Sequence, residues 1–590
     1  MIEARFDDLL PGAERSFRLA EPVGVIEARR PGEVPGAIEA ADAATSRGLW
    51  AAGYVAYEAA PGLDPELAVR VRAPDDPFAE MPLAWFALFE RKEDVPPLEP
   101  TRGEPPAASE SAWRPSVDRA TYDAAIERIR ELIAAGHTYQ VNHTIRLRAS
   151  IRGDARGLYR DLSLAQRGGY AAYLDLGRYR VVSASPELFF RIDADRIRTR
   201  PMKGTAPRGR WPAEDDEIAA RLIDSAKDRA ENAMIVDLLR NDLGRICRPG
   251  SVEVGSLFEA ERYETVWQIT STIEGDLRPG TALLETFRAL FPSGSVTGAP
   301  KVRTTRIIAD LEDSARGPYC GAIGYLAPTG SGEPRASFNV AIRTVVLDAQ
   351  TRTAEYGVGG GITHDSSASG EYEEIVAKAR VLTDVRPAFE LFESLAHAPA
   401  EGFRHLEEHL ERLAGSAGYF GFRFEPEVAA AALKRAVAEV TGPSVVRLTL
   451  ARDGGLSTDV RDLPPADDAV RVAIDDEPVD PSDVWLFHKT TRRAPYDRRL
   501  ERRPDVDDVL LVNDRGEMTE STVANLAVRL EGVWVTPPIH AGLLPGTYRT
   551  VLLREGRLIE RPVTVDELRG AEELALVSSV RGWRPAVLES

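Results

Sequence analysis

Two stretches of the chain place carboxylates at helical spacing. The segment GEYEEIVAKAR puts Glu371 and Glu374 three residues apart, with Lys378 four residues further on. On a helix these three side chains share one face. The segment DRAENAMIVDLLRND places Asp228 and Glu231 at the same spacing. Carboxylates from two helices commonly hold Mg2+, although an exposed acidic helix face gives the same pattern.

Two segments are dense in glycine, FPSGSVTGAPK (291–301) and GVGGGIT (357–363). Glycine lets the backbone approach a ligand and donate N–H groups to it, but ordinary turns and bulges also use it. Lys301, Arg343 and Lys378 supply cations nearby, and Arg343 lies in a predicted strand. Because a planar guanidinium binds both oxygens of a carboxylate, these residues are candidates for holding an anionic ligand.

The last third of the chain carries a different set of groups. WLFHKTTRRAPYD holds Lys489 at the end of a predicted strand, and NDRGEMTESTVANLAV places Glu520 in a predicted turn between two strands. LLPGTYRT supplies Gly546 and Thr547 before a predicted helix. A lysine for an aldehyde, an acid for a pyridinium nitrogen and a helix start for a phosphate are what pyridoxal phosphate requires. Each feature alone is common, and a lone lysine is usually a surface charge.

The composition is that of a soluble globular protein. The 590 residues are 43% apolar and 28% charged, and the length allows three or four domains or two large ones. The net charge of −19 argues against nucleic acid and anionic membrane surfaces as partners. Cys247 and Cys320 are far apart and offer no disulfide framework, which fits a reducing cytoplasm. No signal peptide or apolar run long enough to span a membrane is present.

The elements that must position these groups fall into three predicted regions. Residues 1–115 mix short apolar strands with Pro-rich connections and end in a loop or linker, PPLEPTRGEPPAASESAW. Residues 116–385 alternate helices and strands, and a new pattern runs from 386 to 590. The predicted helices are 122–136, 213–246, 370–382 and 403–422; the predicted strands include 179–192, 320–328, 337–348, 353–363, 445–453, 507–514, 525–532 and 573–579.

Six ordered strings in the first 385 residues resemble the chorismate-utilising enzymes. They are SASPELFF, RPMKGTAPRG, DRAENAMIVDLLRND, FPSGSVTGAPK, CGAIGYL and EYEEIVAKAR. The family includes anthranilate synthase, aminodeoxychorismate synthase component I, and the isochorismate and salicylate synthases. The resemblance implies a mixed α/β fold with a β-sandwich core, and Mg2+ bound to the ring carboxylate of chorismate. It implies metal ligands at Glu231, Glu371 and Glu374, with Asp228 as a weaker candidate, and substrate ligands at Tyr325, Arg343, Gly361 and Lys378.

One position divides this family. The residue at Lys203 is alanine in the anthranilate, isochorismate and salicylate synthases, whereas many aminodeoxychorismate synthases carry lysine. The resemblance implies that Lys203 attacks C2 of chorismate while Glu187 protonates the leaving 4-hydroxyl, and that ammonia then attacks C4. A lysine can be nucleophilic if its pKa is lowered, and a glutamate can be an acid if its pKa is raised. A histidine common in the family is replaced by Gln268, so any role of an imidazole there is in doubt.

The residues after 386 resemble the class IV pyridoxal-phosphate fold of branched-chain aminotransferases, D-amino acid aminotransferases and aminodeoxychorismate lyases. HLERL before the candidate residues and SSVRG after them complete the pattern, within a region shorter than usual for that fold. The resemblance implies that Lys489 holds the cofactor covalently and that Glu520 pairs with its pyridine nitrogen. It implies phosphate contacts from Arg412, Thr547 and Ser579.

Two further details concern this second resemblance. Ala494 replaces a tyrosine usual five residues after the lysine, and Tyr496 is a candidate substitute. The histidines at 405, 409 and 488 are interpreted as packing or surface residues.

Together the resemblances predict a fusion of aminodeoxychorismate synthase component I with aminodeoxychorismate lyase, which makes 4-aminobenzoate and pyruvate from chorismate and ammonia for folate synthesis. Neither cysteine lies in a Gly-x-Cys-x-Gly elbow, so we expect ammonia from solution or from a separate glutamine amidotransferase subunit. Three alternatives stay open. The first half could form anthranilate, the second half could be an aminotransferase, or the chain could be a non-catalytic regulator that binds chorismate or tryptophan.

Overall fold

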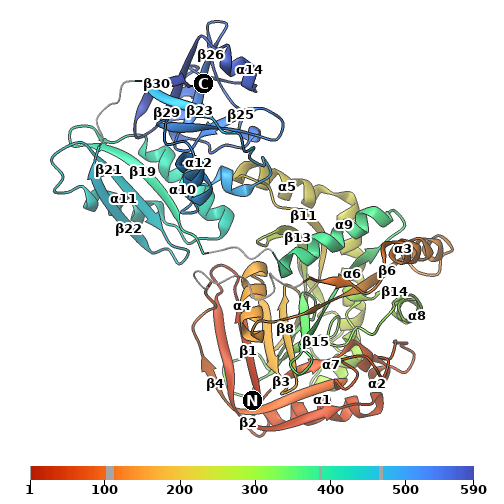
Figure 1. The fold of residues 1–590 in the computed structure, drawn as a ribbon. Coiled ribbons are helices and arrows are strands. Elements are labelled where there is room, and N and C mark those ends of the chain that lie inside the picture. The colour runs from red at the N-terminus through yellow and green to blue at the C-terminus, as the bar shows by residue number, and fades with distance from the viewer. Residues whose placement is uncertain (1, 101–111, 384–387, 464–468, 590) are drawn as a thin grey trace. The chain divides into compact units, whose positions relative to one another are not determined.

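The computed structural model describes residues 2–100, 112–383, 388–463 and 469–589 (Figure 1). The chain divides into two compact units. Unit 1 comprises Met1–Arg208 and Ala219–Pro387, and unit 2 comprises Gly209–Ile218 and Ala388–Ser590. Both units mix helices and strands, which confirms the predicted fold class. Residues 101–111 of the predicted linker and the predicted boundary near 386 lie outside the described residues.

Unit 1 is built on a sheet in which hydrogen-bonded pairings join eighteen strands, from β1 (Glu3–Asp8) to β18 (Thr353–Ile362). Strand β6 (Gln140–Ser150) pairs antiparallel with β18 (Thr353–Ile362) along almost its whole length. Strand β3 (Trp50–Val55) is buried throughout, because its alternate side chains enter two different hydrophobic clusters. A strand covered on both faces has apolar residues at consecutive positions, and this explains the uninterrupted apolar pattern of β3.

Two predicted strands of unit 1 are interrupted, and each interruption carries a candidate site residue. The predicted strand 179–192 is β8 (Tyr179–Ser185) and β9 (Leu188–Asp193), with Glu187 between them. The predicted strand 337–348 is β16 (Ala336–Val340) and β17 (Thr344–Asp348). Arg343 lies in that gap with φ 52°, in the left-handed region that interrupts regular pairing.

The long predicted helix 213–246 is also two elements, α5 (Pro212–Asp224) and α6 (Ala226–Gly244). The residue between them, Ser225, caps α6 by accepting a hydrogen bond from the backbone N–H of Asp228. A serine side chain that satisfies a free N–H favours a new helix start over continuation. The cap fixes the first turn of α6, where Asp228 lies.

The predicted helices 122–136 and 370–382 are confirmed as α3 (Arg119–Ala134) and α9 (Ala368–Ala379). Helix α9 is capped at its start by Ser367, whose hydroxyl accepts from the N–H of Gly370. Its contacts with β18 place the acidic helix face against the glycine-rich strand.

Unit 2 contains a four-stranded sheet, ordered β20-β19-β21-β22, and an eight-stranded sheet, ordered β25-β24-β23-β30-β29-β26-β27-β28. The strands that only complete these sheets are β20 (Gly402–Phe403), β22 (Leu456–Asp462), β23 (Val470–Ile474), β27 (Val533–Thr536), β28 (Ile559–Glu560) and β30 (Gly582–Leu588). Helix α10 (Leu406–Phe420) packs on the smaller sheet through a shared hydrophobic cluster. The strands that carry the candidate site are β19 (Leu391–Ala398), β21 (Ser444–Leu450), β24 (Asp508–Val512), β25 (Met518–Ser521), β26 (Asn525–Leu530) and β29 (Glu573–Ser578).

Two local predictions in unit 2 are wrong. The apolar residues before Lys489 form a 3-10 turn, η5 (Val484–Phe487), and not a strand. The side chain of Asp483 caps that turn, and a short apolar run does not separate a turn from a strand. Glu520 lies within β25 and pairs with Asn525, so it belongs to a strand and not to the turn.

Both cysteines are buried free thiols, as the absence of a disulfide pattern predicts. Burial raises the pKa of Cys247 and of Cys320 to about 11. Among the described residues, no helix is both long enough and apolar enough to cross a membrane.

Candidate active sites

Glu187 lies in a buried position of unit 1, with 3% of its surface exposed. Its Oε1 accepts a hydrogen bond of 2.6 Å from the hydroxyl of Ser295. Burial raises the pKa of Glu187 to about 7, although the Ser295 hydrogen bond and the charge of Lys203 act in the opposite direction. A carboxyl with this pKa is partly protonated at neutral pH and can serve as a general acid.

Lys203 lies on β11 (Met202–Pro207), where a bulge at Gly204 disturbs the pairing with β13 (Val266–Asp276). Its Nζ donates to the backbone carbonyl of Ser295 at 3.1 Å. Burial lowers the pKa of Lys203, while the charges of Glu231 and Glu187 oppose that shift. Ser295 therefore holds both candidate catalytic side chains, one through its hydroxyl and one through its carbonyl.

Gln140 and Lys203 converge on the space above Gly361. A methyl group on Gly361 would lie 2.3 Å from Nε2 of Gln140 and 3.0 Å from Nζ of Lys203. Gln140 is 1% exposed, and within the described part of the chain neither of its amide atoms has a hydrogen-bond partner. A buried amide left unpaired is costly unless a ligand or water completes it. The absence of a side chain at 361 thus lets Gln140 and Lys203 approach the strand, and an unpaired amide lies beside the lysine amine.

The carboxylates of α9 face the neighbouring glycine. A methyl group on Gly360 would lie 2.9 Å from Oε2 of Glu371 and 3.6 Å from Oε1 of Glu374. Burial raises the pKa of Glu371. Burial would also raise the pKa of Glu374, but the ion pair with Lys378 outweighs it and holds that pKa below its ordinary value. The two predicted metal ligands of α9 therefore meet at one point over β18.

Helix α6 supplies the third predicted metal ligand, Glu231. Burial raises its pKa, and Lys203 and Lys227 act against that rise. Asp228 from the same helix lies against Gly204, next to Lys203. In the ranges that the structure describes, no three acidic, histidine or cysteine side chains form a ready metal site. The carboxylate chemistry suits Mg2+, which keeps several waters and needs few protein ligands.

Arg343 and Lys378 are joined through the last turn of α9. Arg343 donates to the backbone carbonyl of Lys378 at 2.5 Å, and Tyr356 donates to the same oxygen at 3.2 Å. Lys378 Nζ donates to the carbonyl of Gly359 at 2.8 Å. These bonds bring two predicted substrate ligands to the strand that carries Gly361.

The fourth predicted substrate ligand, Tyr325, lies in a different environment. Its ring packs in an aromatic cluster with Phe6, Phe17 and Trp50, at centroid distances of 5.1, 5.2 and 6.3 Å. Phe6, Phe17 and Trp50 are not candidate site residues, so these ring contacts do not connect Tyr325 to the other predicted ligands. Gln268, which replaces the family's usual histidine, lies opposite Thr205 and donates to its hydroxyl at 3.3 Å.

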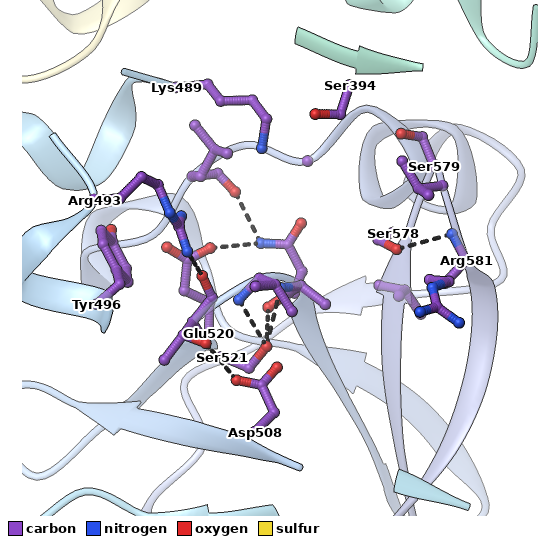
Figure 2. Close-up of a pocket in the computed structure, with 18 of the residues that line it drawn as sticks. Ser394, Lys489, Arg493, Tyr496, Asp508, Glu520, Ser521, Ser578, Ser579 and Arg581 are labelled. Atoms are coloured by element: carbon purple, nitrogen blue, oxygen red, sulfur yellow. Dashed lines mark hydrogen bonds between the residues drawn. The ribbon is translucent and has the colours of Figure 1, made fainter. Parts of the chain in front are cut away.

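Unit 2 contains a cavity of about 960 Å3, and the predicted cofactor ligands Arg412, Lys489, Glu520, Thr547 and Ser579 all line it. In Figure 2 the amine of Lys489 points into this space, with Glu520 below it and Ser579 on the opposite side. Burial, reinforced by the charge of Arg412, lowers the pKa of Lys489 to about 8. Its Nζ lies 4.9 Å from the ring centroid of Phe392 on β19.

Glu520 lies at the base of the cavity and is 5% exposed. Its Oε2 accepts a hydrogen bond of 3.2 Å from Asn525, which also donates to the carbonyl of Leu544 at 2.8 Å. Burial raises the pKa of Glu520 to about 8. A methyl group on Gly546 would lie 1.9 Å from Oδ1 of Asn525, so glycine is required there. Asn525 therefore connects Glu520 to the segment that leads into α13 (Thr547–Arg554).

The three predicted phosphate ligands are linked through side chains that do not line the cavity. Arg412 donates through Nε and Nη2 to the two oxygens of Glu393, at 2.9 and 2.6 Å. Burial alone would raise the pKa of Glu393, but Arg412 and His409 hold it at about 2. His409 in turn contacts the hydroxyls of Ser579 and Thr547 at 2.9 and 3.3 Å. The interpretation of His409 as a simple packing residue therefore needs revision.

Tyr496, the candidate substitute for the missing tyrosine, lines the cavity, and the guanidinium of Arg493 lies 4.7 Å from its ring. Ala494 begins helix α12 (Ala494–Glu501). The other two histidines pack against aromatic rings, His405 on Tyr548 and His488 on Tyr419.

Several site residues carry no signal that the sequence could have revealed. Ser295, Gln140 and Glu393 are a hydroxyl, an amide and a carboxylate whose importance depends on tertiary contacts. Only Ser295 lies in a segment that glycine density had marked. The histidine of HLERL was visible, but its partners come from segments up to 170 residues away.

Comparison with known proteins gives two family matches. The family model for chorismate binding enzyme matches residues 13–384, and the model for amino-transferase class IV matches residues 390–588. Unit 1 thus has the chorismate-binding fold, and the region after 390 is class IV aminotransferase-like.

Each of the individual relatives below matches a part of the chain. Aminodeoxychorismate synthase of Streptomyces pristinaespiralis is 45% identical over 269 residues, which is 45% of this chain and 36% of that protein. Anthranilate synthase component 1 1 of Haloarcula marismortui is 39% identical over 289 residues, or 48% of this chain and 58% of that protein. The crystal structure of anthranilate synthase component I from Streptococcus pneumoniae superposes with a TM-score of 0.53 at 25% identity, covering 63% of this chain and 92% of that one. The chain therefore spans about a third to three fifths of the length of these two curated relatives.

Proposed function

Because the chain belongs to the chorismate binding enzyme family, we propose that it is a bifunctional enzyme that makes 4-aminobenzoate from chorismate and ammonia. Unit 1 aminates chorismate to 4-amino-4-deoxychorismate, and unit 2 removes pyruvate from that product. One observation carries the first assignment. Lys203 and Glu187 are hydrogen-bonded to the same residue, Ser295, and Lys203 lies beside the unpaired amide of Gln140 over Gly361.

The first step uses Lys203 as the nucleophile. Its lowered pKa favours the neutral amine, whose nitrogen forms a bond to C2 of chorismate. The bond between C4 and its hydroxyl breaks as Glu187 gives that oxygen a proton, so water leaves. The pKa of Glu187, about 7, is suited to this donation at neutral pH.

The second step releases the lysine. Ammonia forms a bond to C4, the bond between C2 and the Lys203 nitrogen breaks, and the Glu187 carboxylate takes the proton that the new ammonium gives up. Gln140 can accept a hydrogen bond from the incoming ammonia, since both of its amide atoms lack partners in the described structure. Arg343 and Lys378 are proposed to bind carboxylates of the substrate. Tyr325 is proposed as a further substrate ligand on the resemblance alone.

Mg2+ is proposed as the cofactor of unit 1. Glu371 and Glu374 would hold it over Gly360, with Glu231 from α6 and waters completing its shell. Asp228 remains a candidate for a contact through water. The ion would supply positive charge to a substrate carboxylate, which otherwise faces three carboxylates of the protein.

Pyridoxal phosphate is proposed as the cofactor of unit 2, and the cavity fits it. When bound, the cofactor withdraws electrons from the amine-bearing carbon of a substrate. Glu520 would hold a proton at the pyridine nitrogen, and Arg412, Thr547 and Ser579 would bind the phosphate. The lowered pKa of Lys489 suits a residue that accepts a proton from that carbon and returns one during release of pyruvate. Tyr496 is proposed to replace the missing tyrosine beside the ring.

The ammonia source and the cellular location are also proposals. Ammonia comes from solution or from a separate glutamine amidotransferase subunit. Two buried free thiols are compatible with the reducing cytoplasm, where we place the protein.

The decisive experiment identifies the product. Purified protein is incubated with chorismate, Mg2+, pyridoxal phosphate and ammonium, and the products are separated by chromatography. We expect 4-aminobenzoate and pyruvate. Anthranilate would contradict the role of Lys203. Accumulated aminodeoxychorismate, converted no further unless an amino acceptor is added, would instead favour an aminotransferase, which the class IV match also allows.

A further inference from the structure

His409 lies just behind the cavity wall of unit 2. It is 1% exposed and comes from α10, whereas the hydroxyls that it contacts come from the first residue of α13 and from the end of β29. Its Nδ1 is 2.7 Å from Oε2 of Glu393, and its Nε2 is 2.9 Å from Oγ of Ser579 and 3.3 Å from Oγ1 of Thr547. The imidazole thus separates an acid from two hydroxyls that line the cavity.

The Glu393 contact fixes the tautomer of this imidazole. An ionised carboxylate only accepts hydrogen bonds, so Nδ1 of His409 must carry a proton and donate it. Glu393 is ionised because Arg412 binds both of its oxygens. The remaining choice concerns Nε2, which has a lone pair in the neutral ring and a proton in the imidazolium.

The state of Nε2 decides where the two hydroxyls point. Each hydroxyl has a single proton. When the ring is neutral, the hydroxyl of Ser579 or Thr547 must donate its hydrogen bond to the Nε2 lone pair. In the imidazolium, Nε2 donates to the hydroxyl oxygens and leaves both hydroxyl protons for a ligand in the cavity. A phosphate dianion accepts hydrogen bonds and donates none, so it selects the imidazolium.

The charges around His409 favour the neutral ring when no anion is bound. Burial is the main cause that lowers the pKa of His409, Arg412 on the same helix and Lys489 lower it further, and Glu393 on β19 raises it. His405, the N-cap residue before α10, also repels a proton on His409. The segments that carry Thr547 and Ser579 contribute neutral hydroxyls, with Arg404 donating to the Ser579 carbonyl at 3.4 Å. A dianion beside these groups reverses the balance.

We propose that His409 is a positioning residue that takes up a proton when phosphate enters the cavity and thereby turns the Ser579 and Thr547 hydroxyls into donors to it. This inference rests on the proposed cofactor of unit 2 and adds a mechanism for its capture. The phosphate site becomes fully donating only after protonation, so phosphate affinity depends on pH through a residue that does not touch the ligand.

The test measures protons taken up on binding. Pyridoxine 5′-phosphate is titrated into the full-length cofactor-free protein at pH 8 in two phosphate-free buffers of different ionisation enthalpy. This ligand has the phosphate but no aldehyde, so it cannot react with Lys489. The parent is compared with His409→Gln, whose amide donates from the Nε2 position without titrating. His405→Asn is the matched control, because asparagine tolerates the left-handed conformation at that position.

We expect His409→Gln to take up about one proton fewer than the parent, and His405→Asn to match the parent. Contributions from Lys489 and Glu520 are common to all three proteins and cancel in the difference. Because His409→Gln takes up one proton fewer on binding, its dissociation constant should change about tenfold less per pH unit than that of the parent. Equal uptake by parent and His409→Gln would overturn the inference and leave the proposed cofactor standing.

A second measurement needs no variant. In the parent labelled with 15N-histidine, one of the eight histidines should change from neutral imidazole to imidazolium when pyridoxine 5′-phosphate is added. No change in any histidine overturns the inference even if His409→Gln does not fold. If the parent binds neither pyridoxine 5′-phosphate nor pyridoxal phosphate, both the inference and the proposed cofactor fail.

Discussion

The two units each bury a lysine, but they surround it with a different balance of charges. Lys203 lies among Glu187, Glu231 and Glu374, which favour its protonated form and partly offset the effect of burial. Lys489 lies near Arg412 and Arg493, which act in the same direction as burial. Glu393 and Glu520 act against it. In the proposed reactions, the first lysine works with an acid that protonates a leaving group, and the second works beside a cation that binds a phosphate. The comparison teaches that burial lowers the pKa of both amines, while the neighbouring charges differ with the reaction proposed for each.

The largest effect is expected from Lys489→Ala. The change removes the covalent attachment of the proposed cofactor, so 4-aminobenzoate formation should fall by on the order of 10³-fold or more. Chorismate consumption should continue, because unit 1 keeps its own lysine. Product analysis and the visible absorption of the bound cofactor measure the two parts. Parent-like 4-aminobenzoate formation by this variant would show that Lys489 has another role.

Lys203→Ala tests the other lysine. Loss of the nucleophile should reduce aminodeoxychorismate formation by on the order of 10²-fold, and attack at C2 by ammonia or water should yield traces of anthranilate-like or isochorismate-like products. Supplied aminodeoxychorismate should still be converted. Lys227→Ala is a matched control, since Lys227 has 58% of its side chain exposed and lies near the same Glu231. If Lys203→Ala retains the parent rate and no lysine adduct can be trapped in the parent, the covalent mechanism fails.

Replacing Glu374 by Gln tests the metal proposal. Loss of one carboxylate should raise the Mg2+ concentration that unit 1 requires by about tenfold and lower its turnover. The activity of unit 2 on supplied aminodeoxychorismate should be unchanged. Glu373→Gln, at the preceding position of α9, is the matched control. Equal loss in both units would point to a folding defect and not to a lost ligand.

The smallest change in rate is expected from Ser295→Ala, but its pH signature is specific. The Ser295 hydroxyl stabilises the ionised form of Glu187, so its removal raises the Glu187 pKa above about 7. Since the mechanism needs protonated Glu187, the alkaline limb of kcat/KM for aminodeoxychorismate formation should move to higher pH. The rate should fall a few-fold, as expected for one lost hydrogen bond of about 1 kcal/mol. Ser293→Ala, which removes a partner of Ser295 alone, should leave the limb in place.

Much of the fold could be predicted because each element follows one periodic pattern. The helices α3 and α9 and the strand β18 agree closely with their apolar and glycine patterns. The interruptions within the predicted strands were harder to predict from the sequence. Pro186 next to Glu187 is a local signal for an interrupted strand, but the left-handed backbone of Arg343 has none, because arginine rarely adopts it.

The candidate sites could be predicted only where chemistry depends on residue type. Lysines and paired glutamates were visible as such, whereas the contact between Ser295 and Glu187 joins residues 108 positions apart. No spacing rule covers such a distance. The wrong strand before Lys489 has a similar cause, since the capped turn around Asp483 is decided by one side chain that a short apolar pattern hides.

Strand β18 should respond to alanine substitution in three separable ways at three consecutive positions. A methyl group at Gly359 would lie 2.1 Å from the backbone oxygen of His143, so it should reduce the yield of folded protein. At Gly360 it would meet the Glu371 carboxylate and should change the metal requirement. At Gly361 it would lie 2.3 Å from Nε2 of Gln140, so it should displace that amide and raise KM for chorismate. A library scored separately for expression, metal dependence and substrate affinity would therefore resolve neighbouring glycines into three distinct phenotypes.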